Sequence, residues 1–85
     1  MTASHPLDAR IRSLLTAHGR LTENADTLTA DGDLYQAGLT SHASVNLMLA
    51  LEGEFDLEFP DSMLNRAVFS SIAAIRGALV ELGAV

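Results

Sequence analysis

Ser41 and His42 stand side by side, and a serine beside a histidine is the pair from which many hydrolases build a nucleophile. The residues around Ser41 predict a helix start. Adjacent helix residues point about 100° apart, so these two side chains are not expected to face each other. A catalytic serine also needs an oriented base and an oxyanion hole, and no residues in the sequence supply them. The sequence therefore predicts no catalytic residues and no enzyme.

The sequence also lacks the residues needed for thiol chemistry or for binding a metal ion. The chain has no cysteine, which excludes disulfides and thiolate metal sites. Its three histidines have no zinc-ligand spacing, and its acidic residues do not alternate as in a calcium loop. We expect no metal site, and we expect His5 and His18 to be ordinary surface or helix-end residues.

The length of 85 residues predicts one domain, spanning residues 1–85, with a modest core and little room for an enclosed catalytic pocket. This favours a binding or carrier module over a stand-alone enzyme. The N-terminal residues have no apolar run typical of a signal peptide, and no segment approaches the roughly 18 apolar residues of a membrane span. We expect a cytoplasmic protein that is monomeric on its own and does not associate with membranes.

The formal net charge of −6 is unevenly distributed. All five basic residues are arginines, and none lies between Arg20 and Arg66. An acidic middle repels nucleic-acid phosphate and attracts basic partners, so we expect no nucleic-acid binding. The alternative is a solvated acidic surface that serves solubility. The acidic residues of this stretch are Glu23, Asp26, Asp31, Asp33, Glu52, Glu54, Asp56, Glu58 and Asp61.

Two flanking helices are predicted from apolar periodicity. The first covers residues 6–18, with Pro6 in its first turn and Gly19 as its C-terminal stop. The last covers residues 71–82, with Ser70 as its cap. Each has one buried stripe at helical spacing. These stripes are Leu7, Ile11, Leu14 and Leu15 in the first helix, and Ile72, Ile75, Leu79 and Leu82 in the last.

Residues 20–40 form a long connection rich in turn and cap residues. Leucines recur along it and predict an ordered loop that is anchored to the core, with Tyr35 packing the loop against it. A short helical turn is expected near residues 61–65, and the candidate strand 56–59 is too short to seed a sheet. The pattern predicts an all-α fold, a four-helix bundle with three long helices and one short one. The leucine anchors are Leu21, Leu28, Leu34 and Leu39.

The second helix, predicted over residues 41–54 with Thr40 or Ser41 as its cap, has two apolar faces. Its core face is formed by Leu47, Met48, Leu51 and Phe55. Val45 and Leu49 form a second stripe turned away from that face, with Glu52 near its edge. Such a stripe either packs beneath the long loop or docks a partner. We favour docking.

The segment from Asp33 to Glu52, DLYQAGLTSHASVNLMLALE, resembles the modification-site region of acyl and peptidyl carrier proteins. That family has Asp-Leu, a glycine, then Asp-Ser-Leu and an amphipathic helix. The following residues 51–61, LEGEFDLEFPD, are similar to the acidic and apolar tail of the same region. The resemblance extends over roughly residues 5–82, and it is specific only between 33 and 61.

This resemblance implies a four-helix bundle and a covalent 4′-phosphopantetheine, joined by a phosphodiester to Ser41. It also implies three kinds of partner: a phosphopantetheinyl transferase, an acyl-loading enzyme and a downstream acceptor enzyme. A phosphate is well placed at a helix N-terminus, where free N–H groups and the helix dipole favour it. Because the chain has no cysteine, the carrying thiol would come from the cofactor.

Two residues depart from the family pattern. Thr40 replaces the usual aspartate, a residue that in this family is associated with recognition by the phosphopantetheinyl transferase. His42 replaces the usual leucine and would lie at the edge of the docking surface. A free-standing carrier with Gly-Leu-Thr-Ser-His is similar to the aminoacyl carrier proteins. Dedicated amino acid:carrier protein ligases load those carriers with a small amino acid as a thioester. We expect the docking residues to be Thr40, His42, Val45, Asn46, Leu49 and Glu52.

Two alternatives remain at this point. A fatty-acyl carrier in lipid synthesis would have the same site, because the enzymes choose the cargo. An acidic helical interaction domain that binds a basic partner would share the fold and the docking stripe, and Ser41 would then be only a helix cap.

Overall fold

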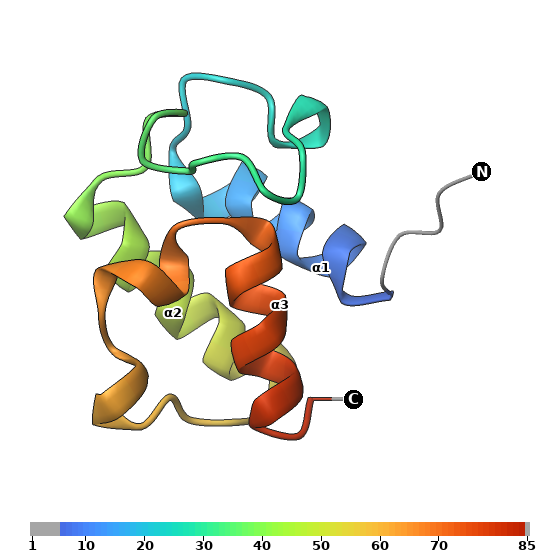
Figure 1. Cartoon of the computed structure of the whole chain (residues 1–85), viewed down its shortest axis with the longest axis vertical. Coiled ribbons are helices and arrows are strands. Elements are labelled where there is room, and N and C mark those ends of the chain that lie inside the picture. Colours follow the sequence, from blue (N-terminus) through green and yellow to red (C-terminus); the bar gives the residue numbers. More distant parts are fainter. Residues whose placement is uncertain (1–5, 85) are drawn as a thin grey trace.

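The computed structural model describes residues 6–84, and Figure 1 shows a small helical bundle. The predicted all-α class is confirmed, and the described part of the chain contains no strand. The short helical turn predicted near residues 61–65 corresponds to the 3₁₀ turn η3, and a second 3₁₀ turn, η4, follows it. His5 lies outside the described residues. The elements are α1 (Pro6–Leu14), a π-helical turn η1 (Leu15–Gly19), η2 (Ala25–Thr27), α2 (Ser41–Phe55), η3 (Asp61–Met63), η4 (Arg66–Phe69) and α3 (Ile72–Glu81).

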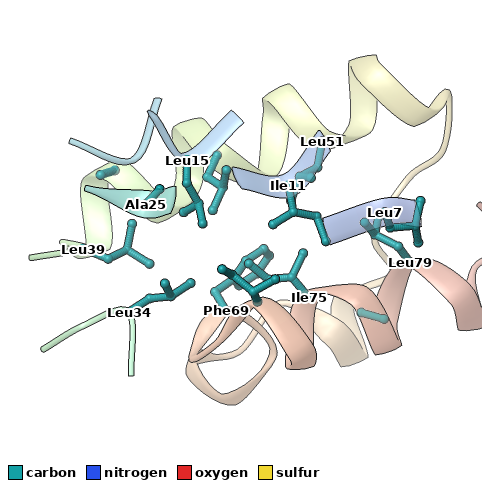
Figure 2. Packing of buried hydrophobic residues seen from close by; sticks show 14 of the residues in the cluster. Leu7, Ile11, Leu15, Ala25, Leu34, Leu39, Leu51, Phe69, Ile75 and Leu79 are labelled. Carbon is teal, nitrogen blue, oxygen red and sulfur yellow. The ribbon is translucent and has the colours of Figure 1, made fainter. Parts of the chain in front are cut away.

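The core lies where the three α-helices meet, and side chains from each point into it (Figure 2). The predicted apolar stripes of the first and last helices are buried in the core. The exceptions are Leu14 and Leu82, which are half-buried at the edge of the core. Phe69 closes the core from η4, and its ring meets that of Phe59 edge-on at 5.6 Å. The largest fully buried side chains are Ile11, Leu15, Leu34, Leu47, Leu51, Ile72, Ile75 and Leu79.

Two predicted helix ends are wrong by one residue. The first helix ends with Arg20, not Gly19, in the left-handed conformation, with φ of 53°. A Cβ added at Gly19 would lie 3.2 Å from Cδ2 of buried Leu15, a tight contact from which the Leu15 side chain would have to shift slightly. At α3 the cap is Ser71, whose hydroxyl accepts the Ala74 N–H, while the Ser70 hydroxyl donates to a carbonyl of η4.

Side chains of α1 tie the bundle together. Asp8, buried at 5 % exposure, accepts two hydrogen bonds from Arg76 of α3 at 2.9 and 3.0 Å. Arg12 donates to two carbonyls of the long connection, those of Ala25 and Leu28, at 2.6 and 2.7 Å. These bonds leave no buried side-chain polar atom unpaired in the described residues.

The 20–40 connection is ordered, as predicted, and lies across one end of the bundle (top of Figure 1). Thr22 N–H donates to the Ala37 carbonyl at 2.9 Å, which closes the loop on itself. Gly38 has a φ of 112°, and a Cβ there would lie 2.8 Å from the Thr22 nitrogen, so only glycine fits. The tight turn at Gly38 buries Leu39 and directs the next residue into the start of α2.

Candidate functional site

Thr40 and Ser41 have different roles at the start of α2. Thr40 is the N-cap, and its hydroxyl oxygen accepts the Ala43 N–H at 3.1 Å. Ser41 is the first helical residue and is exposed, and its hydroxyl makes no hydrogen bond to the described part of the chain. The cap is therefore Thr40, and the hydroxyl of Ser41 remains available for chemistry.

The first turn of α2 suits a negatively charged group. It contains no acidic residue, and its side chains are those of Ser41, His42, Ala43 and Ser44. The unpaired N–H groups of a helix start and the helix dipole favour an anion there. The Ser44 hydroxyl donates to the Ser41 carbonyl at 2.7 Å, so the neighbouring serine is already engaged.

An open groove of about 440 Å³ begins at Ser41 and runs between α2 and the η3–η4 segment. We call it the Ser41 groove. From α2 it is lined by Val45 and Met48 as well as Ser41, and from the opposite side by Leu64 and Arg66. The sequence did not predict the second wall, because nothing in the local pattern shows that the η3–η4 segment returns beside α2.

Tyr35 and Arg66 fix one side of this groove. The Tyr35 hydroxyl donates to the Arg66 carbonyl at 2.9 Å, and the Arg66 guanidinium carbon lies 3.7 Å from the ring centroid. Burial raises the pKa of the Tyr35 phenol, and the nearby Arg66 charge partly opposes that rise. Tyr35 thus holds the long connection against η4, as well as packing against the core.

The second apolar stripe of α2 faces outward. Val45 is 51 % exposed and Leu49 is 56 % exposed, whereas Leu47, on the core face, is completely buried. The alternative that the stripe packs beneath the long loop is therefore wrong for this structure. His42 and Asn46 are exposed beside Leu49, and these three line a second groove on the flank of α2 away from Ser41.

Glu52 lies differently from the other predicted docking residues. Its side chain is half-buried, and its Oε2 accepts the Phe59 N–H at 2.9 Å, which ties α2 to the chain that follows it. The other acidic residues of the middle segment are exposed, so the expected acidic surface is present. No helix within residues 6–84 is long and apolar enough to cross a bilayer.

Comparison of the sequence with known proteins finds a matching protein family and a relative with a similar sequence. A family model described as a phosphopantetheine attachment site matches residues 12–79. The aminoacyl carrier protein of Agrobacterium fabrum is 52 % identical over 69 residues, covering 81 % of this chain and 83 % of that protein.

Two crystal structures extend the comparison. One contains an engineered Bradyrhizobium japonicum glycine:[carrier protein] ligase with a carrier from Agrobacterium tumefaciens and AMP. The match has a TM-score of 0.84 and 49 % identity, and it covers 86 % of this chain and 97 % of the other. The second contains the Bradyrhizobium japonicum ligase with a glycylated carrier. Here the TM-score is 0.64 with 35 % identity, covering 82 % of this chain and 97 % of the other.

Proposed function

Because the chain belongs to the phosphopantetheine-attachment family, and within it to the aminoacyl carrier proteins, we propose that Ser41 is its attachment residue and a small amino acid its cargo. The observation that supports Ser41 most directly is the division of roles at the start of α2. Thr40 satisfies the helix, so the exposed Ser41 hydroxyl can be modified without loss of the cap. The proposal treats residues 1–85 as one carrier domain.

The residues around Ser41 fit a phosphopantetheine group. Its phosphodiester would meet the first N–H groups of α2, in a turn without acidic side chains. The groove beginning at Ser41 offers apolar contact from Val45 and Met48 beside the attachment point. When bound, the group supplies the thiol on which an amino acid is carried as a thioester, a function that this cysteine-free chain cannot perform itself.

The chain itself contributes position and recognition, not catalysis. α2 holds the Ser41 hydroxyl at its exposed end, where a transferase can reach it. Val45 and Leu49 offer apolar contacts to the enzymes that load and unload the carrier, and the acidic surface favours basic partner surfaces. The partners in this proposal are a phosphopantetheinyl transferase, an amino acid:carrier protein ligase and an acceptor enzyme. We place the protein in the cytoplasm, where ATP is available for loading.

Amino acid cargo is favoured over a fatty acyl chain by the names of the relatives. The carrier structures at 49 % and 35 % identity were solved with glycine:[carrier protein] ligases, and one of those carriers is glycylated. The cofactor-free interaction domain is not favoured, because the attachment-site model matches the segment that contains Ser41.

The proposal is tested by intact mass after incubation with coenzyme A and a broad-specificity phosphopantetheinyl transferase. We expect wild type and Ser44→Ala to gain one phosphopantetheine and Ser41→Ala to gain none. Ser44 is the matched control because it is a serine in the same helical turn. A gain on Ser41→Ala, or no gain on wild type with transferases from several sources, would contradict the assignment.

Cargo is tested next on the modified protein, with ATP, the engineered glycine:[carrier protein] ligase and either glycine or alanine. We expect a further mass gain of one aminoacyl group, which hydroxylamine removes because a thioester is labile to it. A carrier that accepts only fatty acyl groups from an acyl-loading enzyme would overturn the cargo assignment and leave that of Ser41 intact.

A further inference from the structure

The second groove on α2 differs in charge from the rest of the protein. It is an open groove of about 530 Å³ between the end of η1 and the outer flank of α2. His18 and Arg20 line it from the first helix and His42 from α2, and its lining includes no acidic residue. We call it the positive groove. Arg20 alone gives this groove its formal positive charge, because the net charge of −6 counts histidines as neutral, and such a local reversal of sign favours an acidic partner.

Arg20 differs from the other four arginines because it makes no hydrogen bond, ion pair or ring contact within residues 6–84. Arg10 forms an ion pair with Glu54 at 2.7 Å, and Arg66 stacks on Tyr35. Arg12 holds two loop carbonyls, and Arg76 binds Asp8. Arg20 is exposed and lines the positive groove, so its guanidinium has all its donors available for another molecule.

The backbone of Arg20 limits which variant can test its role. Its φ of 53° lies in the left-handed region, where glycine or asparagine is accommodated at lower cost than a long side chain. Asp56, which ends α2, has the same φ, so this conformation belongs to the helix ends of this fold.

The groove has an apolar floor beside its positive edge. Leu49, Ala17 and Ala50 line it together with the polar Asn46. Leu49 is more than half exposed, so the groove opens directly onto the outward stripe of α2. A protein element that combines an apolar side chain with a carboxylate fits both features, because an arginine guanidinium pairs with carboxylates, as with phosphates, in a bidentate geometry.

We propose that the positive groove binds an acidic segment of the loading ligase, in which a glutamate or aspartate pairs with Arg20 and a neighbouring apolar side chain covers Leu49. The inference rests on the proposed function, since it names a contact made by the partner of that carrier. In this proposal the ligase binds the flank of α2 away from Ser41. The surface of this chain is positive at that contact, whereas its exposed acidic residues make the middle segment negative.

The test measures the Kd between the unmodified chain and the engineered glycine:[carrier protein] ligase, which binds a carrier 49 % identical to this chain. The informative variant is Arg20→Asn, because asparagine tolerates the left-handed backbone. The matched control is Arg10→Gln, which removes one positive charge from another face of the bundle. We expect about tenfold weaker binding for Arg20→Asn and a salt dependence lower than that of wild type, with Arg10→Gln unchanged.

Two results would overturn the proposal. The first concerns the ligase affinity: either Arg20→Asn binds as tightly as wild type, or Arg10→Gln loses as much affinity as Arg20→Asn. The latter outcome would show that the effect follows from net charge alone. The other is a substantial loss of thermal stability in Arg20→Asn, which would show that Arg20 serves the helix end through its dipole. Mass gain at Ser41 is read separately on all three proteins, so failure of the carrier assignment is distinguished from failure of the docking assignment.

Discussion

The separate roles of Thr40 and Ser41 lead to a prediction about two neighbouring hydroxyl residues that sequence alone treats as equivalent. Thr40→Ala removes the oxygen that accepts the Ala43 N–H at 3.1 Å. Loss of such a cap costs about 1 kcal/mol in the free energy of unfolding. In a chain of 85 residues that corresponds to a fall in Tm of roughly 4–8 °C.

Ser41→Ala should behave in the opposite way. The Ser41 hydroxyl is exposed and makes no hydrogen bond within residues 6–84, and alanine is a better helix former than serine. We therefore expect the free energy of unfolding to stay within about 0.5 kcal/mol of wild type, while modification is lost completely. Thr40→Ser, which keeps the accepting oxygen, should restore most of the stability that Thr40→Ala loses.

The assay is urea unfolding of the unmodified proteins followed by circular dichroism, with a common m-value checked across the series. Stability lost in Ser41→Ala and kept in Thr40→Ala would refute the division of roles, because it would make Ser41 the cap. Equal losses in both variants would show that the two hydroxyls share the capping bond.

Three more predictions concern the faces of the bundle. Leu47→Ala should lower the free energy of unfolding by about 2–5 kcal/mol, because the side chain is fully buried. Leu49→Ala, the same change at a 56 % exposed position of the same helix, should cost less than about 0.5 kcal/mol and weaken ligase binding; similar unfolding curves for both would contradict the faces described. Glu52→Ala should lower the free energy of unfolding by about 1–2 kcal/mol through loss of the bond from Phe59 N–H, whereas no loss would show that this bond does not stabilise the fold. Tyr35, the only tyrosine, should titrate with a midpoint above 10.0 in phenolate absorbance, because burial raises its pKa. Since the folded pKa exceeds the unfolded one, its contribution to stability is complete below pH 10 and is lost as the pH rises further; a midpoint at or below 10.0 would refute this.

The helices themselves could be predicted from sequence because their signals are local. Apolar spacing placed Leu7 and Ile11 in one stripe and located α2 to within a residue at each end. The outward direction of Val45 and Leu49 followed from the same geometry, since the core face was already complete without them.

The cap at α2 could not be predicted because threonine and serine are both good N-caps, and only backbone dihedrals distinguish them. Thr40 has extended backbone, with φ of −96° and ψ of 165°, which places the helix start one residue later. The end of the first helix shows a similar limit. Gly19 appeared to be the left-handed residue, yet its small size serves packing against Leu15 and the positive φ passes to Arg20.

The local sequence pattern could not predict contacts between distant parts of the chain. Nothing in the residues near Tyr35 indicates that its hydroxyl reaches the Arg66 carbonyl, 31 positions away. Glu52 was assigned to the docking surface because it lies at the edge of the stripe, whereas its carboxylate turns back to the Phe59 N–H. Both are tertiary contacts that polar side chains make once the helices have packed, so no local pattern could show them.

On the proposed assignment of Ser41, the two flanks of α2 allow one short helix to serve an attached arm and a protein partner at the same time. Ser41 and Val45 line one groove, while His42 and Asn46 line the other, because residues one position apart point about 100° apart around the helix. On that assignment, an arm attached to Ser41 would enter an enzyme from one flank while the other flank stays bound. We therefore propose that partner choice depends on His42, Leu49 and the neighbouring Arg20, and that the loading enzyme chooses the cargo.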